Sequence, residues 1–144
     1  MELQAERGLA YVMISHNVSV IRHFCDEVAV MYLGQIVEEG PAAALMADPQ
    51  HPYARALVSA APVPRGGPAR PRRIVLEGEP PNPAARPPGC AFHPRCPVAI
   101  DRCRSEMPRL AGIGPDRRAA CHLLGDGGSA RQMLNEALMG RKAA

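Results

Sequence analysis

The chain has 144 residues, a formal net charge of +3 at pH 7 and 47% hydrophobic residues, with no Trp. This length holds one domain or two small ones with a modest core. The small charge disfavours nucleic-acid binding, and no apolar run approaches the ~20 residues that cross a bilayer. The first seven residues carry acids and no apolar stretch of a secretory signal, so we expect a cytoplasmic chain with reduced cysteines.

The N-terminal segment predicts a helix end followed by a buried strand. Residues 1–7 are typical of a helix, with Gly8 as its stop. The unbroken apolar run from Leu9 to Ile14 predicts a strand buried on both faces of a parallel α/β sheet. His16 follows this strand, and ligands of open α/β sheets bind beyond the carboxyl ends of the strands. From position alone, a ligand-binding histidine and a loop histidine without a role are about equally supported.

The next forty residues predict a short series of regular elements. Asn17 or Ser19 caps a helix, and Gly34-Gln35 forms a hairpin turn between two strands. Residues 48–52 are predicted to form a loop. The predicted elements are a helix over 18–25, strands over 28–33 and 36–39, and short helices over 42–46 and 52–60.

The composition changes at residue 61. Residues 62–73 form a linker rich in Pro and Arg, followed by a short predicted strand over 74–79 and a proline-rich stretch to Gly89. The linker arginines offer a nucleic-acid contact, but no aromatic residue lies among them, so we expect no nucleic-acid partner. An apolar face over 129–142 predicts a terminal helix that packs on the body or frays.

Four cysteines with the spacing C-x5-C-x6-C-x17-C form a block in a segment with few core-forming residues. Metal ligation by thiolates would order such a segment, because metal binding then supplies folding free energy. C-x2–4-C knuckles, typical of zinc sites, are missing, which favours an iron–sulfur cluster over zinc. Four free thiols are the remaining alternative. Cys25 is predicted to be a core residue, and His93 and His122 neighbours of the site. The predicted metal ligands are Cys90, Cys96, Cys103 and Cys121.

Several segments together resemble a known family. The sequence Ala-Tyr-Val-Met-Ile-Ser-His-Asn over 10–17 is followed by Asp-Glu-Val-Ala-Val-Met-Tyr-Leu-Gly-Gln-Ile-Val-Glu-Glu-Gly over 26–40. His-Pro-Tyr-Ala-Arg-Ala-Leu over 51–57, Arg-Cys-Pro over 95–97 and Met-Pro-Arg-Leu over 107–110 complete the pattern. Over residues 1–122 the chain resembles the last third of the ATP-binding subunits of oligopeptide/dipeptide ABC transporters.

This resemblance implies an α/β fold, the C-terminal fragment of a P-loop ABC ATPase domain followed by an irregular, cysteine-rich extension. It divides the chain into an ATPase part over 1–62, a linker and extension over 63–124, and a tail over 125–144. His16 matches the switch histidine that contacts the γ-phosphate of ATP. The resemblance also implies an iron–sulfur cluster on the four cysteines, with zinc as the alternative.

The departures from the family pattern are large. The chain contains no G-x-x-x-x-G-K-[ST] loop, no apolar strand ending in Asp-Glu and no Ser-Gly-Gly signature. We therefore expect a fragment that alone neither binds ATP tightly nor hydrolyses it, from a truncated frame, a split gene or a late start.

The resemblance also implies partners and a location. ATP and Mg²⁺ would bind only in the complete subunit, with transmembrane permease subunits, a second ATP-binding subunit and a separately encoded N-terminal portion as partners. The expected location is the cytoplasmic face of the cytoplasmic membrane, or the cytoplasm if the chain is unassembled. The alternative function is a free-standing metal- or iron–sulfur-binding interaction module without an ATPase role.

Overall fold

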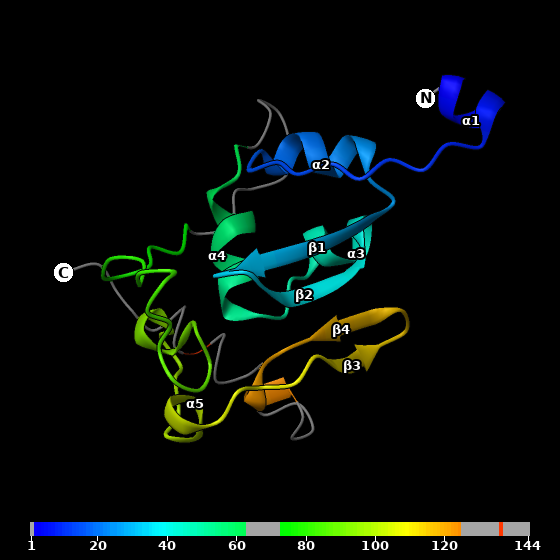
Figure 1. Ribbon diagram of the computed structural model, residues 1–144. Coiled ribbons are helices and arrows are strands. Elements are labelled where there is room, and N and C mark those ends of the chain that lie inside the picture. The colour runs from blue at the N-terminus through cyan, green and yellow to red at the C-terminus, as the bar shows by residue number, and fades with distance from the viewer. Residues whose placement is uncertain (1, 63–72, 125–135, 137–144) are drawn as a thin grey trace.

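The computed structural model describes residues 2–62, 73–124 and 136 (Figure 1). The predicted tail helix over 129–142 lies outside the described residues, apart from the single position 136. The helices are α1 (Glu2–Arg7), α2 (Val18–Phe24), α3 (Ala42–Ala47), α4 (Pro52–Ala60) and α5 (Arg102–Ser105), with 3-10 turns η1 (His93–Arg95) and η2 (His122–Leu124). The strands are β1 (Glu27–Tyr32), β2 (Gln35–Pro41), β3 (Ala111–Gly114) and β4 (Arg117–Ala119).

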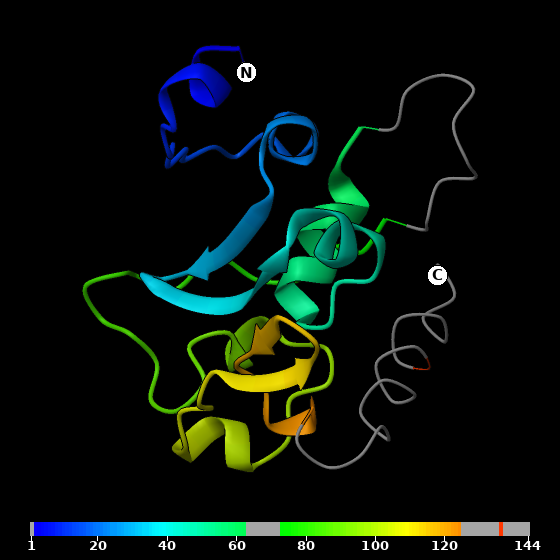
Figure 2. The ribbon, with the colours of Figure 1, turned by 90° about the vertical axis from the view of Figure 1, so that its right-hand side faces the viewer.

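The apolar run after α1 is extended but unpaired, so the prediction of a buried strand there is wrong for the chain as described. Val12 and Ile14 are each 97% exposed, and Tyr11 is 65% exposed. A parallel strand needs neighbouring strands and helices on both faces, and among the described residues no strand pairs with this segment. Both views show α1 standing apart from the body (Figures 1 and 2).

The β1–β2 hairpin is the centre of the fold. Its loop residues Leu33 and Gly34 have φ of 46° and 74°, the pair of positive values that a type I′ turn requires. The predicted turn is therefore one residue too late. The Arg86 guanidinium donates to the Leu33 carbonyl, so the proline-rich segment is tied to the tip of the hairpin.

A second hairpin from the C-terminal part completes one antiparallel sheet in the order β1-β2-β4-β3. β4 pairs with β2 through Glu38 opposite Ala119 and Glu39 opposite Arg118. Neither β3 nor β4 is predicted from the sequence, and the strand predicted over 74–79 is irregular chain in the structure. The ATPase-like part and the extension thus share a sheet.

Two helices pack on this sheet from one side, as Figure 2 shows for α3 and α4. α3 begins directly after β2, and its first N–H, from Ala42, donates to the Asp26 carbonyl at 2.8 Å. Leu45 of α3 and Ala54 of α4 are fully buried. α2 is capped by Asn17 as predicted, because the Asn17 side chain accepts from the N–H groups of Ser19 and Val20.

The core consists of small clusters. One cluster contains Tyr32, Val37 and Phe92, and a second contains Val98 and Leu123. Cys96 packs against both. The structure thus confirms a small unit of mixed helices and strands, whose described sheet is antiparallel. Within the described ranges, no helix has the length and apolarity needed to cross a membrane.

Candidate functional site

His16 lies in a tight turn at the end of the unpaired apolar segment. The Asn17 N–H donates to the Ser15 hydroxyl at 3.0 Å, and Asn17 then caps α2. These bonds hold the backbone on both sides of His16, whose side chain is exposed. The structure therefore presents this imidazole at the surface, beside the extended run 9–14.

The four cysteines of the block come together as free thiols. Cys103 is buried, and the other three are partly buried. The Cys90 N–H donates to the Cys103 carbonyl at 2.9 Å. Gly89 permits this approach, because its φ is +68° and a Cβ there would lie 2.5 Å from the Cys103 carbonyl oxygen.

The thiols influence one another electrostatically. Burial raises the pKa of Cys96 to about 12, and the thiols of Cys121, Cys90 and Cys103 add to this rise. Burial likewise raises the pKa of Cys121 to about 11, with further contributions from Cys90 and Cys103. The pKa of Cys90 is raised by burial and by Cys103. The thiols of Cys90, Cys96 and Cys121 are thus each harder to deprotonate because of neighbouring cysteines of the block.

Nearby backbone N–H groups oppose the effect of burial at three of the thiols. Those of Phe92 and His93 lower the pKa of Cys90, and that of Val98 lowers the pKa of Cys96. Those of Leu123 and Leu124 lower the pKa of Cys121. In each case the effect of burial is larger. Such donors stabilise thiolates, and hydrogen bonds to sulfur tune iron–sulfur clusters.

The arrangement does not, however, amount to a metal site. Among the described residues, which include all four cysteines, no group of three or more His, Cys, Asp or Glu side chains could hold a metal ion. The donor chemistry fits thiolate ligation, but the positions of the side chains do not converge on one point. The predicted iron–sulfur or zinc site therefore has no support from this geometry.

Two histidines and two arginines lie in or beside the block. The His93 ring is within hydrogen-bond distance of the Cys90 carbonyl at 2.9 Å, and the His122 ring of the Glu106 carbonyl at 2.9 Å. Arg95 donates to the Glu77 carbonyl at 3.3 Å, and Arg102 pairs with Glu106. Their bonds thus go mainly to backbone and to a neighbouring acid.

A buried carboxylate joins the two hairpins, and the sequence gives no sign of it. Glu38 is completely buried in β2 and accepts the N–H groups of Gln50 and His51 at 2.7 to 3.0 Å. Its remaining partner is the Arg117 guanidinium of β4 at 2.7 Å, which also donates to the Asp48 carbonyl. Glu38 follows the buried Val37, so the expected alternation of a half-buried strand is broken here.

His51, between Glu38 and α4, is a structural histidine. It is 1% exposed, and its Nδ1 accepts the Tyr53 N–H at 3.1 Å. Burial lowers its pKa from 6.5 to about 3, so the ring is neutral. A neutral imidazole is the form that can accept this capping bond.

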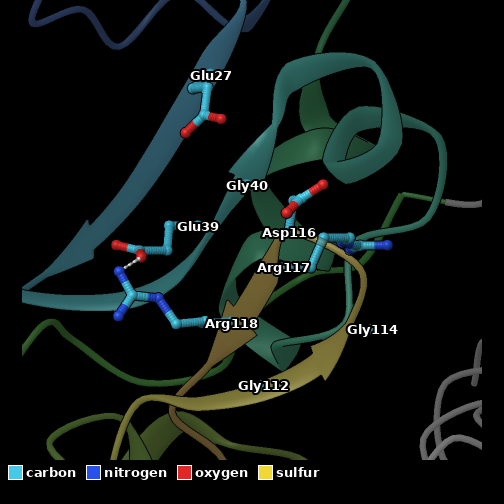
Figure 3. Close-up of a pocket in the computed structure, with 8 residues that line it drawn as sticks. All are labelled: Glu27, Glu39, Gly40, Gly112, Gly114, Asp116, Arg117 and Arg118. Carbon is cyan, nitrogen blue, oxygen red and sulfur yellow. Dashed lines mark ion pairs between the residues drawn. The ribbon is translucent and has the colours of Figure 1, made fainter.

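An open hollow of about 420 Å³ lies between the two hairpins (Figure 3). Arg118 pairs across it with Glu39, while the Arg117 side chain extends away toward the buried Glu38. Within the hollow, the charges of Glu39 and Arg118 thus compensate each other. The lining residues are Glu27, Glu39, Gly40, Gly112, Gly114, Asp116, Arg117 and Arg118.

Comparison with known proteins connects this architecture to a family. Residues 37–103, from the middle of β2 through Cys103, match the model of the oligopeptide/dipeptide transporter C-terminal region. This part of the chain is similar to that family. The match includes the Glu38 carboxylate, the His-Pro-Tyr segment and three of the four cysteines of the block.

Relatives extend the match over most of the chain. The chain is 55% identical over 124 residues to the "Probable peptide ABC transporter ATP-binding protein y4tS" of Sinorhizobium fredii. This match covers 85% of the chain and 35% of that protein. The chain is 52% identical to the di/tripeptide transport ATP-binding protein DppF of Pseudomonas aeruginosa and 48% to the oligopeptide transport ATP-binding protein AppF of Bacillus subtilis, with 85% of the chain and 37% of each relative covered. These matches confirm the resemblance to the C-terminal part of such proteins. The chain spans about a third of their length.

Proposed function

We propose that this chain forms the C-terminal part of an ATP-binding subunit that couples ATP hydrolysis to the import of oligopeptides or dipeptides. The observation that carries the proposal is the identity near 50% over 85% of the chain to proteins named for peptide transport. The free-standing metal-binding module, the alternative considered from sequence, has no comparable support. We place the subunit at the cytoplasmic face of the cytoplasmic membrane.

His16 is proposed as the switch histidine. It is exposed, it follows an apolar segment suited to a sheet, and the capped turn around Asn17 fixes its backbone. An imidazole in this place can donate a hydrogen bond to a γ-phosphate oxygen and help to orient the attacking water.

The rest of the nucleotide site comes from residues that this sequence does not contain. A phosphate-binding loop, the acids that hold Mg²⁺ and the signature segment would be supplied by upstream residues or by a separately encoded N-terminal portion. The exposed segment Leu9–Ile14 is where that portion would pair, because both of its faces are apolar and open. Transmembrane permease subunits and a second ATP-binding subunit would complete the transporter.

The division of the chain into an ATPase part over 1–62, an extension over 63–124 and a tail over 125–144 is part of this proposal. It describes roles rather than separate folding units, since β2 and β4 belong to one sheet.

The same proposal keeps the thiol block as the site of an iron–sulfur cluster, with zinc as the alternative. The support for it is the sequence alone: four cysteines gather in a segment with few core-forming residues, where thiolate ligation would supply folding free energy. Cys90, Cys96, Cys103 and Cys121 would hold the group, which would supply structural cross-linking of the extension.

Peptide uptake tests the transport function. The chain is fused after the N-terminal portion of the Pseudomonas relative DppF and expressed in a strain that lacks this protein. We expect uptake of a radiolabelled dipeptide to be restored, whereas the N-terminal portion alone restores none. A fusion that accumulates and binds ATP but leaves uptake at the background level would contradict the proposal.

Metal analysis tests the thiol block separately. The chain is purified without oxygen, supplied with iron and sulfide or with zinc, and assayed for bound metal beside a Cys96→Ser variant. A brown protein with iron and sulfide supports the cluster, and a colourless protein with one zinc supports the alternative. A metal-free protein under both conditions would refute both, and leave the transport proposal untouched.

A further inference from the structure

Phe92 is the residue through which the extension enters the core of the β1–β2 hairpin. Its side chain is 1% exposed. Its ring packs against Tyr32 of β1 at 5.2 Å, Tyr53 of α4 at 5.5 Å and His51 at 5.7 Å between ring centroids. We call these three partner rings the aromatic box. The tilted and edge-on angles, from 54° to 85°, are those that aromatic pairs prefer.

The backbone of the same residue belongs to the thiol block. The His93 N–H donates to the Cys90 carbonyl at 2.9 Å, so Phe92 lies inside a turn that begins at Cys90, and the Cys90 N–H donates to the Cys103 carbonyl. Cys90 and Cys96 also pack against the cluster that contains Phe92. A change at the Cys90 sulfur therefore acts on the peptide group that carries the buried ring.

We propose that Phe92 couples the thiol block to the β1–β2 hairpin, so that a change at Cys90 or Cys96 shifts the ring in the aromatic box, and a change in the box opens the thiol block. The proposal goes beyond the transport function and does not depend on it, because it rests on contacts within this chain. It also holds whether or not the thiols bind a metal.

Two features confine the proposed movement to Phe92 and its immediate neighbours. The aromatic box is closely packed, and a packed core shifts between discrete arrangements rather than deforming smoothly. The extension is also tied to the hairpin elsewhere, by Arg86 at the Leu33 carbonyl, by Arg117 at Glu38 and by the pairing of β4 with β2. Phe92 can therefore change position while the extension stays attached.

The chain offers a direct probe, because it contains only two Phe residues. Labelling with fluorophenylalanine gives one ¹⁹F signal from Phe92 and one from Phe24, which is 64% exposed. We expect Cys90→Ala to shift or broaden the Phe92 signal and leave the Phe24 signal unchanged. Cys25→Ala, beside Phe24, is the matched control and should move only the Phe24 signal.

Reciprocal coupling is tested from the other side. Tyr53→Leu removes one wall of the aromatic box, and the rate of alkylation of each cysteine is followed by mass spectrometry. We expect alkylation of Cys90 and Cys96 to become about tenfold faster, the ratio that corresponds to 1.4 kcal/mol of easier opening. Tyr11→Leu, at a Tyr that is 65% exposed, should change neither rate, and Cys25 is the internal reference.

Specific outcomes overturn the proposal. One is a Phe92 signal that does not respond to Cys90→Ala or Cys96→Ala. Another is alkylation that accelerates equally at Cys25, or equally in Tyr11→Leu, which would indicate general loosening. If the Cys90 variant unfolds and both ¹⁹F signals merge, the alkylation rates of the folded Tyr53→Leu chain decide.

Discussion

Replacing Arg117 by Met should strongly destabilise the junction between the two hairpins. Glu38 has no exposed surface, and Arg117 is its sole cationic partner among the described contacts, with 14% of that side chain exposed. Met keeps much of the side-chain length but removes the charge. The variant would leave a buried carboxylate with only the N–H groups of Gln50 and His51.

The expected magnitude follows from this burial. Breaking a buried ion pair on one side costs about 3–5 kcal/mol, because an uncompensated charge stays inside. The neighbouring pair Arg118–Glu39 on the same two strands is 60% and 20% exposed, and pairs of this kind contribute about 0–1 kcal/mol. Arg118→Met is therefore a control in the same strand pairing. The double variant Glu38→Gln/Arg117→Met removes both charges and should regain a large part of the loss.

Urea denaturation followed by far-ultraviolet circular dichroism measures these differences. The urea midpoint of Arg117→Met should fall far below that of the unsubstituted chain. The midpoint of Arg118→Met should stay close to that of the unsubstituted chain. Equal midpoints for the two single variants would refute the reasoning, because the buried pair would then contribute no more than a surface pair.

Three further predictions rest on individual contacts. Tyr32→Phe should be neutral or stabilise by up to about 1–3 kcal/mol in urea denaturation, since the buried Tyr32 hydroxyl has no partner among the described residues; a clear loss of stability would reveal a partner. Stability should fall as pH drops from 6.5 toward 3, by up to about 1.4 kcal/mol per pH unit, because unfolding lets His51 take up a proton that its lowered folded pKa of about 3 excludes. His51→Asn should flatten this dependence, and an unchanged slope would show that other groups cause it. Gly89→Ala should loosen the thiol block, seen as faster alkylation of Cys90, because its φ is +68° and its new Cβ would meet the Cys103 carbonyl; unchanged protection would contradict that.

Local elements were predictable because their signals are local. The Asn17 cap, the stop at Gly8 and the Pro52 start of α4 each depend on residues a few positions apart, and all appear in the structure. The hairpin was predicted within one residue.

Long-range features were not predictable in this way. The pairing of β2 with β4 brings together positions 38 and 119, and the short strand Arg117–Ala119 has no apolar alternation of its own. The burial of Glu38 depends on Arg117, 79 residues away. For the run Leu9–Ile14, the local pattern predicts a buried strand that the structure does not show. Its apolar residues are exposed, because burial there would need additional strands.

The role of His16 is the centre of the functional account, and ATP turnover by the DppF fusion tests it most directly. His16→Ala should lower turnover by about a hundredfold or more while ATP binding, measured by equilibrium dialysis, is largely retained. His23→Ala, at the exposed side of α2, should leave both unchanged. Equal turnover in the His16→Ala fusion and the unsubstituted fusion would contradict the account.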